Sequence, residues 1–187
     1  MWIKYVCVKN KPNEIYSVTE DKLFRVLKRK FAKGDTVPGI KKLICGRKLG
    51  SGVYRETFEL LQDKRFVVKI ERDTKNAYFT NVCEFRNYIT HKDWRQLGPW
   101  LAPCIAINEN GSILIQRRAT IKGKKRSDFP KKVPAMLTDL KVTNFGWIGK
   151  RFVCFDYPFM PVTVRSLGKK GIMRVAKWRG SLQDANY

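Results

Sequence analysis

Three strand-like segments lie close together in the first half of the chain and restrict the fold to one that contains a sheet. Residues 44–49, 54–61 and 65–72 are rich in β-branched and aromatic side chains, which favour extended strands. The turn Gly50-Ser51-Gly52 separates the first two segments. The pattern predicts neighbouring strands of an antiparallel sheet.

Two further hairpins are predicted along the chain. The apolar segments 104–107 and 112–116 flank the sequence Asn-Glu-Asn-Gly, which is typical of a tight turn between two strands. The second hairpin is predicted at 144–157, where Gly149-Lys150 supplies the turn. Strands are also expected near the N-terminus, at residues 2–8 and 15–18.

Helices are predicted between and beyond these strands. Residues 19–33 and 76–92 carry apolar side chains at helical spacing. Shorter helices are predicted at 133–140 and at the end of 164–179, and Pro38-Gly39 predicts a break in the chain.

The order of these elements predicts an α+β protein in three parts. A strand and helix extension occupies residues 1–40, a sheet-rich part occupies 41–118, and a shorter basic part occupies 119–187. The 187 residues suffice for one domain, or for two small lobes that share a cleft.

The charge of the chain is strongly positive. Lys and Arg number 39 against 16 Asp and Glu, which gives a net charge of +23. Such a field attracts polyanions, including nucleic acid, acidic protein and nucleotides. The basic residues concentrate in 117–132 and near the C-terminus, where solubility and polyanion binding are both open interpretations.

Cysteine and histidine usage bounds the chemistry further. The five cysteines are well separated and lie beside apolar residues, and there is one histidine. This distribution argues against a zinc site, predicts core thiols, and suits a reducing compartment. No run approaches the roughly 20 apolar residues of a membrane span, and no secretory leader is recognised. We therefore expect a cytoplasmic protein that does not associate with membranes.

Two motifs in the sheet-rich part suggest a phosphate site. Glycines at Gly50 and Gly52 let the backbone approach a phosphate and offer N–H groups to it, although a simple hairpin turn is an alternative. Lys69 lies mid-strand between apolar residues, where a buried lysine needs an anionic partner. Glu84, on the following helix, can supply that carboxylate. Strand alternation could instead direct Lys69 to solvent.

Two further motifs in the basic part suggest a metal site. Asp139 and Asn144 share one loop before a predicted strand. Asp156 follows the apolar run 152–155, where a lone carboxylate is costly unless it binds a cation. An amide oxygen and a carboxylate together suit Mg²⁺, which prefers oxygen ligands.

These motifs, in this order, resemble the protein-kinase signature set. The matching pieces are Gly-x-Gly between strands, Val-Val-Lys-Ile, a helix Glu, Asp-Leu-Lys-x-x-Asn and Asp-Tyr-Pro. The chain looks most similar to compact, atypical serine/threonine kinase-like proteins of the phage type, over residues 42–160. The resemblance implies a two-lobed fold with an antiparallel N-lobe sheet and a strongly shortened C-lobe. It also implies a setting in the host cytoplasm if the protein is viral.

The resemblance implies ATP and Mg²⁺ as cofactors. It assigns nucleotide-binding roles to six residues: Gly50, Ser51, Gly52, Lys69, Glu84 and Gln116. The glycine turn would cover the phosphates, and the lysine, held by the glutamate, would contact the α- and β-phosphates. The glutamine would lie beside the adenine.

Catalytic and metal-binding roles follow from the same resemblance. Asp139 would orient the attacking hydroxyl of a protein or small-molecule acceptor, and Lys141 could reach the γ-phosphate, with Lys69 as the third catalytic residue. Asn144 and Asp156 would hold Mg²⁺. The implied reaction is transfer of the γ-phosphoryl group from ATP to a hydroxyl.

The sequence departs from the kinase pattern in several places. Arg55 stands where the third glycine is expected, Leu137-Thr138 replaces His-Arg, and Pro158 follows the Asp-aromatic pair in place of glycine. The stretch after this pair is too short for an activation segment and the usual C-terminal helices. An alternative is therefore a catalytically inactive kinase-fold module that binds nucleic acid or acidic protein through its basic surface.

In that alternative, two tryptophans of the basic part could take part in binding. Trp147 and Trp178 could stack on bases. The competing interpretation is that both pack in the core.

Overall fold

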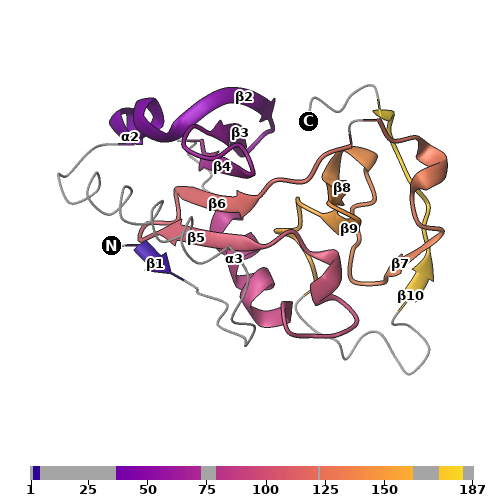
Figure 1. The fold of residues 1–187 in the computed structure, drawn as a ribbon. Coiled ribbons are helices and arrows are strands. Elements are labelled where there is room, and N and C mark those ends of the chain that lie inside the picture. The colour runs from indigo at the N-terminus through magenta and orange to yellow at the C-terminus, as the bar shows by residue number, and fades with distance from the viewer. Residues whose placement is uncertain (1, 5–36, 73–78, 122, 162–172, 183–187) are drawn as a thin grey trace, which may run out of the picture.

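The computed structural model describes residues 2–4, 37–72, 79–121, 123–161 and 173–182 (Figure 1). These residues form an α+β protein with one antiparallel sheet, few helices and a C-terminal part of hairpins and turns. The predicted helix at 19–33 and the strand at 15–18 lie outside the described residues. Among the helices of the described ranges, none combines the length and apolar character needed to cross a bilayer.

The sheet has six strands in the order β1-β5-β6-β4-β3-β2, and all neighbours are antiparallel. In that order the strands are β1 (Trp2–Lys4), β5 (Cys104–Asn108), β6 (Ile113–Arg117), β4 (Phe66–Glu71), β3 (Arg55–Leu60) and β2 (Cys45–Ser51). The three strands predicted between residues 44 and 72, and the hairpin of β5 and β6, are confirmed.

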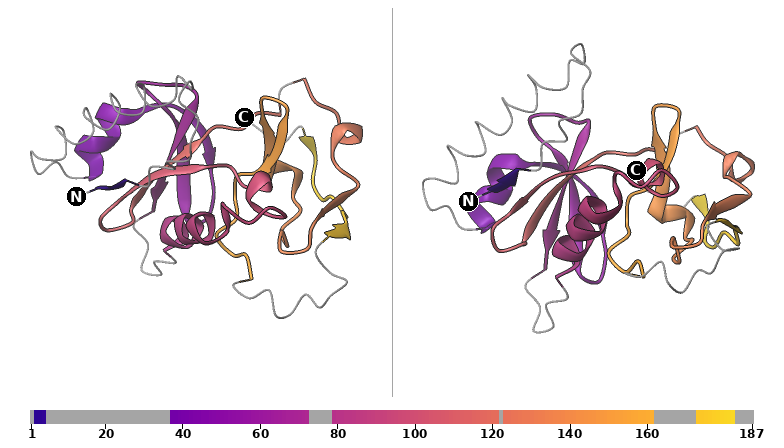
Figure 2. Two further views of the ribbon diagram at one scale, coloured as in Figure 1. Left: turned by 60° about the horizontal axis from the view of Figure 1, so that its bottom comes forward. Right: turned by 90° about the horizontal axis from the view of Figure 1, so that it is seen from below.

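The two faces of the sheet are covered by different parts of the chain. Side chains alternate along a strand, so Phe66, Val68 and Ile70 of β4 enter one core while Lys69 points to the opposite face. The helix α3 (Thr80–His91) lies across that opposite face, as Figure 2 shows. The predicted helix at 76–92 is therefore present, within the residues that the structure describes.

The helix α2 (Val37–Ile44) begins where the sequence predicts a break, so that prediction is wrong. Pro38 and Gly39 occupy its first turn. Proline is tolerated there because the N–H groups of a first turn have no intrahelical partner. The helix also runs across the boundary expected between residues 40 and 41.

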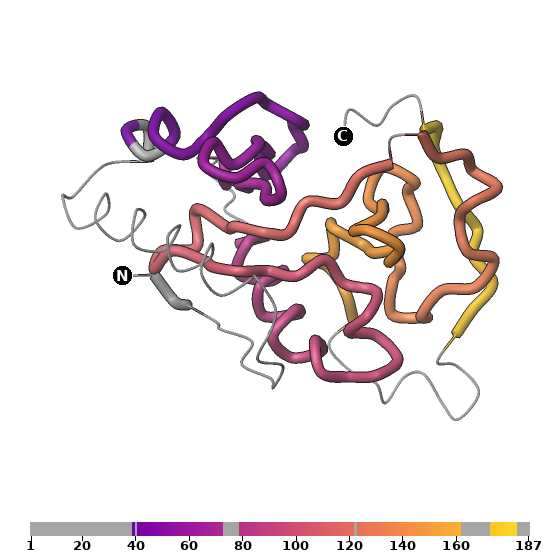
Figure 3. Tube along the Cα trace, in the orientation of Figure 1, coloured from indigo at the N-terminus to yellow at the C-terminus, as the bar shows by residue number. Residues whose placement is uncertain are grey.

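The C-terminal part is built on short pairs of strands. β8 (Phe145–Ile148) and β9 (Arg151–Cys154) form the predicted hairpin. β7 (Lys132–Pro134) pairs with β10 (Met173–Val175), and Figure 3 shows their traces side by side. This pairing makes the helix predicted at 133–140 wrong, and residues 173–175 of the second predicted helix are likewise a strand.

Three short 3₁₀ helices complete the described chain: η1 (Gly98–Trp100), η2 (Arg126–Asp128) and η3 (Val142–Asn144). The second lies in the basic segment that the sequence predicts as an exposed loop. Most of its described residues are exposed, but Ala119, Ile121 and Phe129 are buried and anchor the segment.

An aromatic cluster forms the centre of the C-terminal part. Its members, with ring centroids 4.7–5.7 Å apart, are Phe129, Phe145, Trp147, Phe152 and Trp178. Most pairs meet edge to face, the geometry that aromatic quadrupoles favour. Both tryptophans belong to it, so the interpretation that they pack in the core is confirmed.

Candidate functional site

A cleft of about 480 Å³ lies between the turn that follows β2 and the segments that flank the β8–β9 hairpin. Six of the predicted site residues line it: Ser51, Gly52, Asp139, Lys141, Asn144 and Asp156. They come from three stretches that are far apart in sequence. The cleft thus brings the glycine turn and the predicted metal ligands together.

The register of the β8–β9 hairpin places Asn144 close to Asp156. Phe145 pairs with Cys154, so the residues just outside this pair face each other, and the Phe155 amide donates to the Asn144 carbonyl at 2.9 Å. The side chain of Asp156, which is 43% exposed, follows directly and faces the cleft.

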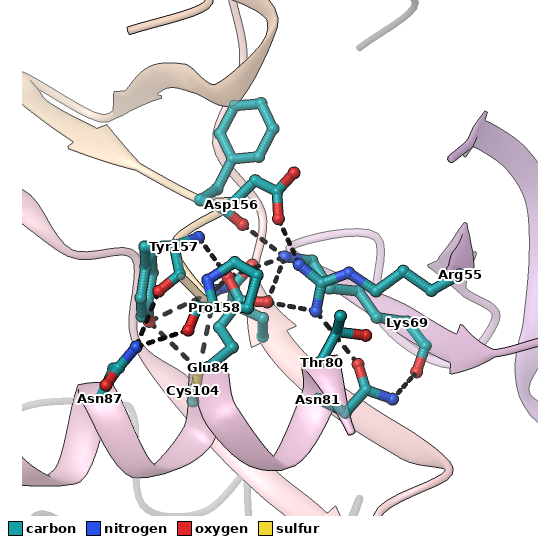
Figure 4. A network of polar contacts seen from close by, with 12 residues as sticks. Arg55, Lys69, Thr80, Asn81, Glu84, Asn87, Cys104, Asp156, Tyr157 and Pro158 are labelled. Atoms are coloured by element: carbon teal, nitrogen blue, oxygen red, sulfur yellow. Dashed lines mark hydrogen bonds and ion pairs between the residues drawn. The ribbon is translucent and has the colours of Figure 1, made fainter. Parts of the chain in front are cut away.

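Lys69 and Glu84 form the predicted ion pair (Figure 4), and neither residue lines the cleft. The Lys69 side chain donates to both Glu84 oxygens, at 3.1 Å and 3.0 Å, and also to the carbonyl oxygen of Phe155. Lys69 is 3% exposed and Glu84 is 0% exposed. The interpretation that Lys69 points to solvent is therefore wrong, because α3 covers its face of the sheet.

Glu84 is the centre of a larger polar network. Besides Lys69, it is approached by Arg55 Nη1 at 2.5 Å, Gln116 Nε2 at 3.2 Å and the backbone N–H of Tyr157 at 3.2 Å. A fully buried carboxylate requires such partners, because burial without them is strongly unfavourable. The network joins the sheet, α3 and the segment that follows β9.

Gln116 does not lie where the resemblance implies. Its side chain is fully buried and contacts Glu84, Cys104 Sγ at 3.7 Å and the Tyr157 hydroxyl at 3.4 Å. Strand alternation explains this position: Ile113 and Ile115 point to one face of β6, while Leu114 and Gln116 point to the face covered by α3. The glutamine is a structural part of the network and does not line the cleft.

The glycine turn is a closed hairpin. The amide of Gly52 donates to the carbonyl of Arg55 at 2.9 Å, so this N–H is engaged within the turn. Gly50 pairs with Thr57 in the sheet and does not line the cleft, whereas Ser51 and Gly52 do. The simple hairpin interpretation therefore describes the backbone better than a cradle of free amides.

Arg55 belongs to this network, although the sequence motifs assign it no role. Its guanidinium enters the network: Nη1 contacts Asn81 Oδ1 at 3.2 Å as well as Glu84, and Nη2 forms an ion pair with Asp156. The sequence holds a signal for it, since Arg55 replaces an expected glycine and Asp156 is expected to need a cation. That cation is supplied here by the protein.

The charges of this network balance. Lys69 and Arg55 carry two positive charges, and Glu84 and Asp156 carry two negative ones. Burial alone would raise the pKa of Asp156, but Arg55 and Lys69 outweigh it and hold that pKa below its usual value. Burial, together with Arg55, lowers the pKa of Lys69.

Asp139 is held in place at the mouth of the cleft. Asn144 donates to its Oδ2 at 2.9 Å, Arg179 approaches its Oδ1 at 2.9 Å, and Lys141 lies 3.9 Å away. Backbone bonds from the Val142 amide to the Arg179 carbonyl, and from the Arg179 amide to the Leu140 carbonyl, fix this arginine beside the loop. The carboxylate is 47% exposed and so remains accessible to a ligand.

The oxygen donors suit one Mg²⁺ that arrives with phosphate. The amide nitrogen of Asn144 is used by Asp139, which leaves the amide oxygen as an acceptor in the cleft that Asp156 also lines. Within the described ranges, no cluster of three or more His, Cys, Asp or Glu side chains could hold a metal. Asn144 and Asp156 alone therefore form no complete metal site; a Mg²⁺ ion held by these two oxygens would need phosphate and water oxygens for the rest of its shell, as Mg²⁺ commonly has.

No protein-family model matches the chain, and no curated protein matches it significantly. Any functional assignment therefore rests on the geometry of the cleft and on the motifs that line it.

Proposed function

We propose that this chain is an ATP- and Mg²⁺-dependent phosphotransferase of the protein-kinase type, with a two-lobed kinase-like fold and a strongly shortened C-lobe. One observation carries the proposal. The buried Lys69–Glu84 pair does not itself line the cleft, but Arg55, which pairs with Glu84, lines it together with Asp139, Asn144 and Asp156. These are the residue types that phosphoryl transfer requires, in the order in which the kinase signatures occur.

The arrangement of the sheet supports this fold. The glycine turn joins β2 and β3 at one edge, Lys69 lies on the adjacent β4, and α3 carries its carboxylate partner. The β5–β6 hairpin then leads into the C-terminal part, which supplies the opposite wall of the cleft. Lys69 is 3% exposed and does not line this cleft, so a nucleotide between these walls would first meet Arg55, Asp156 and the Asp139 loop.

In this proposal each cleft residue has a defined task. Lys69 binds the α- and β-phosphates, and Asn144 and Asp156 hold Mg²⁺. The ion, when bound, supplies positive charge to the transferred phosphoryl group. Asp139 accepts a hydrogen bond from the acceptor hydroxyl and orients its oxygen. Lys141, next to that carboxylate, adds positive charge where negative charge develops.

Cytoplasmic location is part of the same proposal, in the host cell if the protein is viral. Cys45, Cys83, Cys104 and Cys154 are free thiols in the structure, which suits a reducing compartment.

The test is nucleotide binding by the full chain, followed by transfer. ATP with Mg²⁺ should raise the midpoint of thermal unfolding, since a ligand that binds only the folded state stabilises it. Asp156→Asn should remove the Mg²⁺-dependent part of this shift. Transfer is measured with γ-labelled ATP, to the protein itself or to a cell lysate. A wild-type chain that binds no ATP at millimolar concentration would overturn the proposal.

A second depression favours the alternative of a polyanion-binding module. Its volume is about 320 Å³, and four of its lining residues are cationic: Lys64, Arg65, Arg117 and Arg118. Two of these charges are partly compensated, because Arg65 pairs with Asp63 and Arg118 with Glu59.

Salt dependence separates this alternative from the enzyme. Binding of a labelled single-stranded oligonucleotide through phosphate contacts weakens steeply with salt, because each neutralised phosphate releases counterions. Arg117→Gln should reduce the slope. Such binding without any phosphoryl transfer would favour the inactive module.

A further inference from the structure

Arg55 is placed unusually for a charged residue. It follows the glycine turn as the first residue of β3, yet its side chain is only 9% exposed and lines the wall of the cleft. A long cationic side chain at the edge of a glycine turn usually extends into solvent. Here two carboxylates and an amide draw it inward.

The guanidinium is fixed at one end and faces the cleft at the other. Nη1 is anchored by Glu84 at 2.5 Å and by Asn81 at 3.2 Å, both on α3. Nη2 meets Asp156, whose carboxylate is part of the cleft lining. Figure 4 shows the guanidinium with one amino group directed at Glu84 and Asn81 of α3 and the other at Asp156, which belongs to the cleft lining.

The turn itself creates a need for such a donor. The Gly52 amide is engaged by the carbonyl of Arg55, so it is not offered to a phosphate. A guanidinium carries several N–H donors in a planar fork that matches phosphate geometry, and it stays charged at any physiological pH. Arg55 thus engages the Gly52 amide with its carbonyl and supplies N–H donors from its own side chain nearby.

We propose that Arg55 is a phosphate-binding residue of this cleft, which contacts the triphosphate in place of the backbone amides of a glycine turn. This inference rests on the proposed function and deepens it. Arg55 and Lys69 form a pair of buried cations, both held by Glu84, under the position of the phosphates. If Asp156 bound the Mg²⁺ that accompanies a triphosphate, the guanidinium of Arg55 that it now neutralises would become available to the phosphates.

The balance of charges has a consequence for Mg²⁺ alone. Asp156 is already neutralised by Arg55, so the ion without phosphate meets a site with no net negative charge. Mg²⁺ alone should therefore bind weakly to the wild-type protein. Removal of the guanidinium should strengthen binding of the bare ion and weaken binding of the triphosphate, two effects of opposite sign.

The experiment measures three affinities by calorimetry on the full chain: for ATP with Mg²⁺, for inorganic tripolyphosphate, and for Mg²⁺ alone. Arg55→Met should weaken both phosphate ligands by about ten- to a hundredfold, since hydrogen bonds to charged groups are strong. The same substitution should increase the affinity for Mg²⁺ alone. The matched control is Arg47→Met, which removes an exposed arginine paired with Glu59 outside the cleft and should leave all three affinities unchanged.

Arg55→Lys keeps the buried charge and carries the test if Arg55→Met does not fold. Lysine lacks the planar fork, so phosphate affinity should fall by at least about fivefold while the unliganded protein stays folded. Phosphate binding that is unchanged or tighter in the variant would overturn the inference. Tighter binding would show that the Arg55 side chain occupies the phosphate position and that ligands must displace it.

The two proposals can fail separately. Arg55-dependent binding of tripolyphosphate by a protein that does not bind ATP would uphold the role of Arg55 and overturn the kinase assignment. ATP binding whose affinity is the same with and without Arg55 would support the kinase assignment and overturn the role of Arg55.

Discussion

Lys69 donates hydrogen bonds to both carboxylate oxygens of Glu84, at 3.1 Å and 3.0 Å, and thereby attaches the central strand β4 to α3. The same carboxylate receives Arg55 from β3 and the Tyr157 amide from the segment after β9. One buried side chain thus holds the sheet, the helix and the far wall of the cleft in register.

Glu84→Gln should lower the free energy of unfolding by about 3–5 kcal/mol, because Lys69 and Arg55 would lose the charge that compensates their burial. The measurement is urea denaturation. The matched control is Glu56→Gln: Glu56 pairs with Lys41 and Lys48 near the edge of the sheet, and loss of such accessible pairs should cost under about 1 kcal/mol. Equal losses in the two variants would contradict the central role of Glu84.

Asp139→Asn should spare nucleotide binding and stop transfer. The side chain lies at the mouth of the cleft beside Asn144 and Arg179, so its removal leaves Lys69 and Asp156 in place. The rate of γ-phosphoryl transfer in a single turnover should fall by about 10²–10⁴, the usual contribution of a general base. Asp128→Asn, on the exposed η2, is the control. Loss of ATP binding in the Asp139 variant would show that this carboxylate acts in binding.

Gly98→Ala should destabilise the fold, because an added Cβ would lie 2.1 Å from the carbonyl oxygen of Lys92. Overpacking of this kind costs about 1–3 kcal/mol or more, since backbone must shift. At Gly52 the nearest atom would be the Arg55 carbonyl oxygen at 3.6 Å, an ordinary contact. Gly52→Ala should therefore change the free energy of unfolding by less than about 0.5 kcal/mol. Thermal and urea unfolding of the two variants, compared side by side, checks the contrast.

Acid stability should depend on Arg55. Burial alone would raise the pKa of Asp156, but Arg55 and Lys69 hold it below its usual value. An acid whose pKa is lower in the folded state contributes stability that is complete above its unfolded pKa, about 3.9, and that is lost as the pH falls through the folded value. In Arg55→Met the folded-state pKa of Asp156 should rise towards its unfolded value, so this contribution, and the loss of stability in acid that comes from it, should shrink.

The pH titration is followed by the carboxyl ¹³C resonance of Asp156, alongside acid unfolding. Arg47→Met serves as the control, because Arg47 acts on Glu59 and not on Asp156. An Asp156 titration that stays the same without Arg55 would contradict the ion pair as the cause.

Local patterns predict the sheet well, because β-branched runs and tight turns specify strands and hairpins without reference to the rest of the chain. They fail at β7 and β10, three-residue strands whose partners are about 40 residues apart, where pairing alone decides the structure. The same alternation that buries Leu114 also buries Gln116, so periodicity along β6 argues against an adenine contact by that glutamine.

The site was predictable only in part. The order of the motifs identifies Lys69, Asp139, Asn144 and Asp156 as candidates. The register of the β8–β9 hairpin explains why Asn144 and Asp156 lie in the same cleft. The contacts of Arg55 are with Asp156, 101 residues away, and with a carboxylate of α3. The local sequence shows that Arg55 replaces an expected glycine, but it does not identify these partners. Whether Lys69 is buried likewise depends on α3 covering that face of the sheet.

One continuous core includes Leu114 of the sheet, Leu137 of the segment after β7, and Phe145 of β8. Separation of the sheet from the C-terminal part would expose this core to water, which is strongly unfavourable. We therefore expect heat to melt both halves in a single calorimetric transition. A ligand of the proposed cleft would enter past the exposed side chains of Val53 and Phe159, which line it, without separation of the two halves.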